Sequence, residues 1–458
     1  MEKHHHHERS TFSGKLGFVL SAAGASVGLG NIWRFPYLAA KYGGGIFLLI
    51  YIILALTFGY SMIIAETALG RMTRKSPVGA FGKFGKSKWL SFGGWINAVI
   101  PILIVPYYSV IGGWVIKYLI EYVKGNSQKL AEDGYFSAFI SDGTSTEICF
   151  LVFALLTLAI IFAGVRNGVE RVSKFMMPIL VFLSVLIAIY SVTRPGALAG
   201  VKYFLVPNPA NFSWMTVVAA MGAMFSSLSI AMGILVTFGS YMKRDVSIEG
   251  STTNVEIFDT AIAIMAGLMI IPAVFAFSGG DPDTLQAGPA LMFITIPKVF
   301  ANMGFGTPIG IIFFLLVLMA ALTSSIALTE SAVSTFQDEL RWPRKGATVI
   351  VGIIMVILGS LSSLGYGPLA FVKIIGMQFL DFFDFLTNSV MMPIAAFATC
   401  ILISRVIGVG KIEEEVEADG GSFKRKKVFR FMIRYLCPIF TVIILLSSVA
   451  NAFGWISM

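Results

Sequence analysis

Long apolar runs separated by short polar stretches are the main pattern along this chain. Runs such as 352–364 and 435–453 show no alternation of polar and apolar positions, which a membrane-spanning β-strand would require. A helix crosses the hydrocarbon core with about 20 apolar residues, because its backbone N–H and C=O groups pair within the segment. Hydropathy and helix-breaking residues therefore predict an all-α polytopic membrane protein with eleven transmembrane helices, at 14–40, 45–70, 89–123, 147–163, 168–192, 213–241, 255–278, 307–336, 346–364, 373–403 and 430–455.

Composition agrees with a membrane protein, and the position of the charges orients it. The chain is 56% hydrophobic and 13% charged, whereas a soluble domain averages about 25% charged residues. The net charge of +9 first suggests a nucleic-acid partner. With the N-terminus inside, however, 25 of the 34 Lys and Arg fall in cytoplasmic stretches, as the positive-inside rule requires. We therefore expect no nucleic-acid partner.

The same rule predicts the location of the chain. We expect a multi-pass protein of a bacterial cytoplasmic membrane, with the lipid bilayer as its surroundings and the C-terminus outside, because the helix count is odd. Residues 1–13 are predicted to form a cytoplasmic tail and residues 404–429 a cytoplasmic loop. The oligomeric state stays open.

Cysteine and histidine form no catalytic or metal-binding pattern. Cys149, Cys400 and Cys437 are far apart in the sequence. The run His4–His7 could bind a metal ion, but a tag or a solvated tail is the better interpretation. An enzyme would need a nucleophile with its base, or a metal cluster, elsewhere in the chain. The sequence therefore indicates that the protein is not an enzyme.

Glycines and polar residues interrupt two of the predicted helices. In segment one, three glycines precede Asn31 and Arg34, although each Gly costs a helix about 1 kcal/mol relative to Ala and an Arg within the membrane costs more. Close packing of small residues explains the glycines but neither Asn31 nor Arg34. Segment six contains Ser226, Ser227 and Ser229, which could also bond back to their own helix.

The two interrupted helices open two five-helix halves, 14–192 and 213–403, and leave helix 430–455 over. Because five is odd, the second half enters the membrane upside down. Interrupted helices at matching positions of inverted halves are typical of transporter binding sites, where unwound backbone offers N–H groups to a carboxylate and carbonyls to a cation. Thr323 and Ser324 in segment eight could be packing residues, or could complete an all-oxygen shell for a small hard cation.

The stretch 24–36, Gly-Ala-Ser-Val-Gly-Leu-Gly-Asn-Ile-Trp-Arg-Phe-Pro, resembles the highly specific first-helix signature of the neurotransmitter:sodium symporter family. The resemblance covers essentially the whole chain and includes Gly43–Gly45, Glu66 before Gly70 and Arg71, Tyr107, Tyr108, Gly168, Pro178, Ser240, Tyr241, 322–325 and 338–340. It implies a LeuT-type fold, with two inverted five-helix repeats plus one extra helix where many members have two. It also implies two sodium sites and alternating access.

The resemblance further implies binding residues, position by position. The first sodium ion would take the carbonyl of Ser26 with Asn31, Ser227 and Asp259, beside the substrate carboxylate. The second would take the carbonyls of Gly24, Val27 and Ala320 and the hydroxyls of Thr323 and Ser324. The substrate pocket would be lined by Ala25, Ser26, Leu29, Gly30, Ile104, Tyr108, Ser226, Ser227, Ser229, Met232, Ser324 and Leu328, with Tyr108 donating its phenol to the substrate carboxylate. Arg34 and Asp384 would form the extracellular gate, and Arg9, Asp338 and Tyr241 the intracellular gate.

Three positions bear on the substrate. Ser226 stands where members usually carry a Phe that covers the substrate, and Ala231 replaces the first glycine of a Gly-x-Gly break. Gly28 stands where monoamine-carrying members have an aspartate, so the substrate should bring its own carboxylate. We therefore expect a sodium-coupled symporter of neutral, hydrophobic L-amino acids, with the preferred side chain left open. The alternative is a non-transporting receptor or a channel on the same scaffold.

Asp259 bears on the ions. It falls where chloride-dependent members have an asparagine, and a carboxylate there can bind sodium and supply the balancing charge itself. We therefore expect no chloride requirement. The alternative is that Asp259 caps the start of segment seven, since helix N-termini favour acids; its depth in the predicted span favours the sodium interpretation.

Overall fold

The computed structural model describes residues 9–457, so His4–His7 lie outside the described residues. Within this range every named element is helical. Nine helices are long and apolar enough to cross a membrane, and a pair bent by 54°, Lys15–Ser26 with Gly30–Lys41, makes a tenth candidate. The nine are Gly45–Thr73, Lys88–Val123, Gly143–Phe162, Val165–Val192, Ile248–Ser278, Gly306–Leu340, Arg344–Leu364, Phe379–Ile407 and Lys426–Ala452.

Several spans carry more than one label because π-helical turns, marked η, interrupt them. The first half contains α1 (Lys15–Ser26), η1 (Gly30–Arg34), α2 (Phe35–Lys41), α3 (Gly45–Leu54), η2 (Ala55–Gly59), α4 (Tyr60–Thr73), α5 (Pro77–Gly82), α6 (Lys88–Val123), α7 (Ser127–Leu130), α8 (Tyr135–Ser141), α9 (Gly143–Phe162), η3 (Val165–Glu170), α10 (Arg171–Val192) and α11 (Ala197–Leu205). The second half contains α12 (Trp214–Ser227), α13 (Ile234–Ser240), α14 (Ile248–Ser278), η6 (Leu291–Thr295), α15 (Ile296–Ala301), α16 (Gly306–Leu340), α17 (Arg344–Leu364), α18 (Phe379–Asp384), η7 (Phe385–Met391), α19 (Met392–Ile401), η8 (Leu402–Ile407), α20 (Val409–Val416), α21 (Lys426–Phe431), η10 (Met432–Leu436) and α22 (Cys437–Ala452). Short 3-10 turns are η4 (Pro209–Asn211), η5 (Pro282–Thr284) and η9 (Glu417–Asp419).

The predicted set of eleven spans is confirmed only in part. Segment six, predicted to be interrupted, consists of two short helices, α12 and α13, separated by residues 228–233. Segment ten begins later than predicted, because residues 373–378 form a turn closed by a bridge between Ile374 and Met377. Segment seven begins earlier, at Ile248, where the Ser247 hydroxyl accepts the Gly250 N–H at 3.1 Å as an N-cap. The other limits agree within a few residues.

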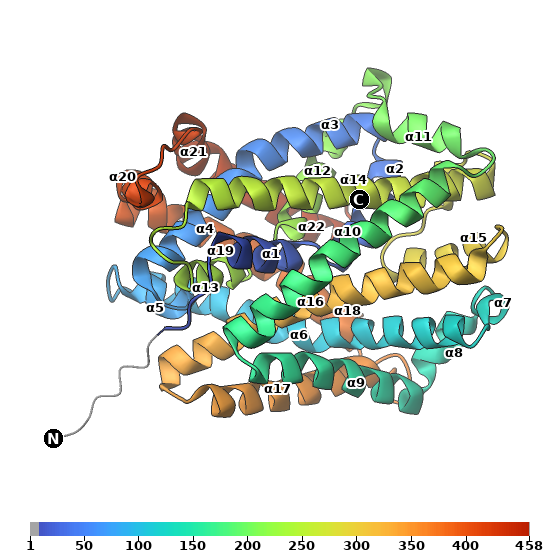
Figure 1. Cartoon of the computed structure of the whole chain (residues 1–458), viewed down its shortest axis with the longest axis horizontal. Coiled ribbons are helices and arrows are strands. Elements are labelled where there is room, and N and C mark those ends of the chain that lie inside the picture. The colour runs from blue at the N-terminus through green and yellow to red at the C-terminus, as the bar shows by residue number, and fades with distance from the viewer. Residues whose placement is uncertain (1–8, 458) are drawn as a thin grey trace.

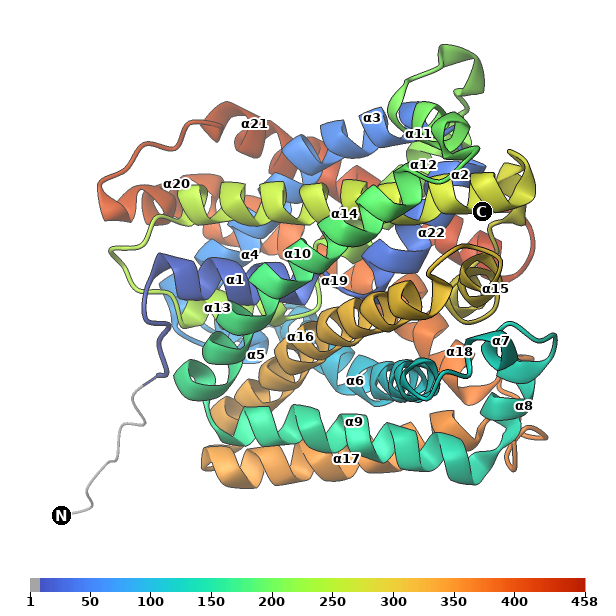
Figure 2. The same cartoon turned by 45° about the vertical axis from the view of Figure 1, so that its right-hand side comes forward.

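The long helices run roughly along one common direction (Figure 1). α9 and α17 lie together at one edge of the bundle, and α3 and α14 lie toward the opposite edge, in both views (Figures 1 and 2). α6 and α16 pack against each other between these edges. The beginning of α1 and the elements α5, α13 and α20 gather at one end of the bundle, and α7, α8, α11 and α15 gather at the other (Figure 1).

The sixth segment is broken by a run of unusual backbone conformations. Ser229, Ala231 and Gly233 have φ of +54°, +61° and +71°, and side chains other than Gly adopt this region only with strain. Two hydrogen bonds hold the unwound stretch. The Ala231 N–H donates to Glu66 Oε1 at 2.8 Å, and the Ser229 hydroxyl donates to the carbonyl of Ala25 at 3.0 Å. The second bond joins the break in segment six to the break in segment one.

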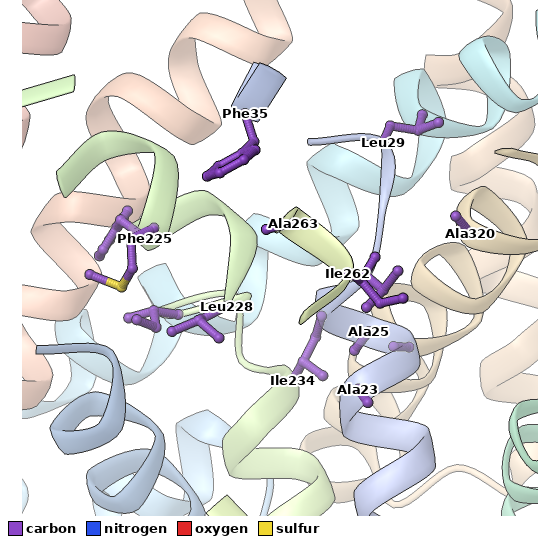
Figure 3. Close-up of a cluster of buried hydrophobic side chains, with 14 of the residues drawn as sticks. Ala23, Ala25, Leu29, Phe35, Phe225, Leu228, Ile234, Ile262, Ala263 and Ala320 are labelled. Carbon is purple, nitrogen blue, oxygen red and sulfur yellow. The ribbon is translucent and has the colours of Figure 1, made fainter. Parts of the chain in front are cut away.

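Apolar side chains enclose both breaks. Figure 3 shows Ala25, Leu29, Phe225, Leu228 and Ile234 around the unwound stretches, and all of them are buried. Unpaired backbone groups are costly in such surroundings, so the breaks persist only because side chains or bound ligands satisfy them. The fold thus places backbone carbonyls and N–H groups that are not paired within a helix in a water-poor interior.

Candidate functional site

A cavity of about 390 Å³ lies between the two broken segments and reaches the α18–η7 region. Every predicted substrate residue lines this cavity except Ser227. The sequence prediction missed a further set of lining residues, which includes Tyr107, Ile111, Val218, Gly222, Ile234, Ser389, Ser447 and Ser448. The paired hydroxyls of Ser447 and Ser448 in an otherwise apolar helix were a sequence signal that could have found the wall formed by α22.

Tyr108 marks one end of the cavity. Its hydroxyl accepts the Leu29 N–H at 3.3 Å, which places the phenol beside the unwound backbone of segment one. A Cβ atom at Gly28 would lie 2.7 Å from Ser324 Oγ and 3.0 Å from Tyr108 Oη. A side chain at residue 28 would therefore require the Ser324 or Tyr108 hydroxyl to move. The space beside Gly28 is narrower than the sequence suggested, because two hydroxyls already occupy it.

Three of the four residues predicted for the first sodium ion meet in the interior. Ser227 Oγ lies 2.9 Å from both carboxylate oxygens of Asp259, and Asn31 Nδ2 lies 2.9 Å from Ser227 Oγ and 3.0 Å from Asp259 Oδ1. The fourth, Ser26, points its own hydroxyl at the carbonyl of Ala22 at 3.1 Å. The structure adds Tyr51, whose hydroxyl donates to Asp259 Oδ2 at 3.2 Å.

Asp259 does not cap a helix N-terminus. α14 begins at Ile248, so Asp259 lies three turns inside it, and the cap is Ser247. Asp259 is also buried, with 1% of its surface exposed. A buried carboxylate at this depth requires donors or a cation, and Asn31, Ser227 and Tyr51 all face it. The capping alternative is therefore wrong.

The five residues predicted for the second sodium ion lie together where α1 ends against α16. Ser324 Oγ lies 3.2 Å from the carbonyl of Gly24 and 3.4 Å from that of Val27, and Thr323 Oγ1 lies 3.1 Å from that of Ala320. A Cβ atom at Gly24 would come within 3.2 Å of Thr323 Cβ. The glycine therefore permits the close approach that brings carbonyls and hydroxyls into one cluster.

The predicted extracellular gate is not joined by an ion pair in the described part of the chain. Arg34 Nη1 donates to Ser226 Oγ at 3.4 Å, whereas Asp384 accepts from Tyr107 Oη at 3.2 Å and from Asn388 Nδ2 at 2.5 Å. Both gate side chains line the cavity. Each of the two side chains therefore hydrogen-bonds to another residue at the cavity wall.

The three residues predicted for the intracellular gate contact one another. Arg9 Nη1 lies 2.5 Å from Asp338 Oδ1, and the guanidinium lies over the Tyr241 ring at 4.9 Å. The sequence did not indicate the network behind this pair. Tyr241 Oη donates to Glu330 Oε1 at 2.7 Å, and Arg344 pairs with the same carboxylate at 2.5 Å. The cavity is lined by Arg34 and Asp384 but not by Arg9 or Asp338, which suits a carrier and differs from a continuous pore.

The available oxygen atoms suit hard cations. Within residues 9–457, no group of three or more His, Cys, Asp or Glu side chains is placed to hold a metal ion. The two clusters instead present carboxylate, hydroxyl, amide and backbone carbonyl oxygens. Such ligands favour alkali and alkaline-earth ions over soft transition metals.

Comparison with known proteins gives consistent results. Residues 9–131 and 136–454 match the family described as the Sodium:neurotransmitter symporter family. An uncharacterized sodium-dependent transporter of Bacillus subtilis, YhdH, is 34% identical over 96% of this chain and 97% of its own length. The sodium- and chloride-dependent GABA transporter 2 of Mus musculus is 27% identical over 90% of this chain and 75% of its own length.

A solved structure is also similar. The crystal structure of MhsT in complex with L-phenylalanine superimposes with a TM-score of 0.84 and 35% sequence identity. The match covers 96% of this chain and 100% of the MhsT chain.

Proposed function

Because this chain belongs to the sodium:neurotransmitter symporter family, we propose that it couples uptake of a neutral, hydrophobic L-amino acid to two sodium ions. The chain is a multi-pass membrane transporter, and its family is one of symporters rather than enzymes. One observation carries the proposal. Both oxygen-rich clusters, around Asp259 and around Thr323, include residues of the broken stretch 24–31, which also lines the cavity. Ions and substrate would therefore bind to the same unwound backbone.

The proposed substrate class follows from the absence of a side-chain charge at Gly28. Gly28 provides no side chain, so the protein offers no carboxylate at that point for an amine. An α-amino acid would bring its own carboxylate to Tyr108 Oη and the backbone N–H groups near Leu29. Ile104, Met232 and Leu328 would surround its side chain. The bound L-phenylalanine of MhsT supports this class of substrate.

Alternating access would use the two gates in turn. In the proposed orientation, with the N-terminus inside, the arrangement with Arg9 bound to Asp338 is open to the outside. Substrate and sodium would enter past Arg34 and Asp384, and closing that gate would bring these two charges together. Opening the inner side would require breaking the Arg9–Asp338 pair and the contact with Tyr241.

Uptake into proteoliposomes tests the proposal. Liposomes that contain the purified protein should accumulate radiolabelled L-phenylalanine when an inward sodium gradient is imposed. The accumulation should stop when potassium replaces sodium. Dopamine or serotonin should compete far less well than L-leucine or L-alanine. Sodium-independent accumulation would contradict coupling. Sodium-dependent binding without any accumulation would identify a receptor on the same scaffold.

A further inference from the structure

The loop that follows η8 folds back over α14, which carries Asp259, and over α4, which continues the span of Tyr51. α20 and α21 lie at the end of the bundle where α1 begins (Figures 1 and 2). Arg71 on α4 is buried and donates from Nε to Glu415 Oε1 at 2.7 Å and from Nη1 to the carbonyl of Val246 at 2.6 Å. The loop is therefore fixed to α4 and to the segment that leads into α14.

Arg425, at the end of this loop, joins α14 to the span formed by α3, η2 and α4. Its guanidinium forms a two-pronged pair with Glu256 on α14, at 3.0 and 2.6 Å, and lies over the Tyr60 ring at 3.4 Å. It also donates to the carbonyl of Leu56 in η2 at 3.2 Å. A bidentate Arg–carboxylate pair fixes orientation as well as distance.

A second contact reinforces the same junction. Glu249 lies in the first turn of α14. Its Oε1 accepts a hydrogen bond from the Tyr60 hydroxyl at 3.0 Å, and its Oε2 accepts one from the Lys424 N–H at 2.8 Å. Both acids are buried, with 7% of Glu249 and 2% of Glu256 exposed. We call Arg425, Glu256, Glu249 and Tyr60 the Arg425 clamp.

The clamp lies next to the first cation cluster, closer to the N-terminus of α14. Glu256 precedes Asp259 by just under one helical turn, so the two side chains share a face of α14. Tyr51, on the same span as Tyr60, donates to Asp259 at 3.2 Å. α14 is thus joined to the α3–α4 span at two neighbouring levels, once through Asp259 and once through the clamp.

We propose that Arg425 is a positioning residue for transport: by holding Glu256 against the α3–α4 span, it fixes the rotation and height of α14 and therefore the placement of the Asp259 carboxylate. The inference rests on the proposed sodium-coupled function. Removing a side chain that orients a cation ligand without touching the cation typically changes cation affinity by about 10–100-fold. Asp259 follows Glu256 by three residues on α14. The placement of its carboxylate therefore depends on the clamp.

The test measures binding of radiolabelled L-phenylalanine to the purified full-length protein over a range of sodium concentrations. In Arg425→Gln the half-saturating sodium concentration should rise by about tenfold, while the substrate affinity at saturating sodium should stay near the native value. Arg425→Lys should recover part of the loss, because an ammonium restores the charge but not the fork. Lys427→Gln, at an exposed basic residue of α21, is the matched control and should behave as native.

Further variants separate positioning from other effects. The double variant Arg425→Gln with Glu256→Gln removes both charges. It should keep the sodium shift if the contact positions Asp259, and a return to native values would show that an unpaired Glu256 charge was the cause and overturn the proposal. Glu256→Gln alone serves if Arg425→Gln fails to fold, and it should shift the sodium dependence in the same direction.

Two outcomes distinguish the failure of this inference from that of the proposed function. If the native protein binds L-phenylalanine without any dependence on sodium, the proposed function and the positioning role are both wrong. If native binding requires sodium but Arg425→Gln matches Lys427→Gln, only the positioning role is overturned. An equal loss of substrate affinity at saturating sodium would show a general structural role and would overturn it as well.

Discussion

The cluster around Asp259 and the cluster around Thr323 draw their oxygen atoms from different sources. The first is built from side chains of three separate segments, Asn31, Ser227 and Asp259, and contains one carboxylate. The second combines hydroxyls of Thr323 and Ser324 with backbone carbonyls of Gly24, Val27 and Ala320, and contains no formal charge. Its carbonyls of Gly24 and Val27 lie where α1 ends, and a helix C-terminus favours cations.

This difference indicates how each cluster would respond to substitution. A cation at the first cluster would be balanced mainly by one side chain, so removing that charge should be severe. At the second cluster the stabilisation would be spread over several backbone dipoles, which side-chain substitutions leave in place. We therefore expect unequal effects from changes of similar size.

The largest effect is expected from Asp259→Asn. The variant keeps the shape of the side chain and removes its charge, and removing one partner of a buried charged pair typically costs about 3–5 kcal/mol. Without chloride, uptake of L-phenylalanine at physiological sodium should therefore be lost, and the half-saturating sodium concentration should rise by at least about 100-fold.

Sodium-dependent binding, measured by scintillation proximity on purified protein, checks this expectation. Asp245→Asn, which neutralises an exposed acid before α14, is the control and should leave the sodium dependence unchanged. If Asp259→Asn bound sodium as the native protein does, the carboxylate would not belong to a cation site and the contrast between the clusters would disappear.

A smaller effect is expected when both hydroxyls of the second cluster are removed. Thr323→Ala combined with Ser324→Ala leaves the carbonyls of Gly24, Val27 and Ala320 in place. The loss of two neutral ligands should cost about 1–3 kcal/mol, which raises the half-saturating sodium concentration about tenfold to 100-fold. Substrate binding at saturating sodium should persist in part, because the first cluster is intact although Ser324 also lines the cavity.

Ser325→Ala provides a matched control on the same helix. The Ser325 hydroxyl lies 3.1 Å from Thr157 Oγ1 on α9, away from the broken segment. This variant should therefore show native sodium dependence. Native behaviour of the double variant instead would show that the hydroxyls of Thr323 and Ser324 bind no ion.

The sequence predicted the interrupted helices well because their residues are locally anomalous. Asn31 and the serines of segment six conflict with an apolar helix, and the structure places a break at each. The limits of segment ten were less predictable. Residues 373–378 are partly apolar, but a bridge between Ile374 and Met377 turns the chain before α18 begins. Hydropathy alone does not distinguish an apolar turn from the end of a helix.

Contacts between distant segments could not be read from the sequence. Tyr51 and Asp259 are 208 residues apart, and their hydrogen bond depends on how α3 packs against α14. The separation of Arg34 from Asp384 depends on the conformation of the whole cavity. The start of α14 was also missed, because its first residues are polar and resemble a loop until Ser247 is seen to cap them.

The smallest expected effect sharpens the comparison most directly, because it concerns only the charge of the first cluster. An anion beside a cation needs donors, and here the hydroxyls of Tyr51 and Ser227 already donate to Asp259, at 3.2 and 2.9 Å. One turn further along α14, the buried Ala263 offers no hydroxyl (Figure 3). We therefore expect transport not to depend on chloride. Replacing sodium chloride by sodium gluconate should leave the initial rate of L-phenylalanine uptake in proteoliposomes unchanged.

In Asp259→Asn the hydroxyls of Tyr51 and Ser227 no longer face a carboxylate. Chloride should therefore restore part of the lost uptake, whereas gluconate should not. A strong chloride requirement in the native protein would show that Asp259 does not balance the cation, and the two clusters would then be electrostatically alike.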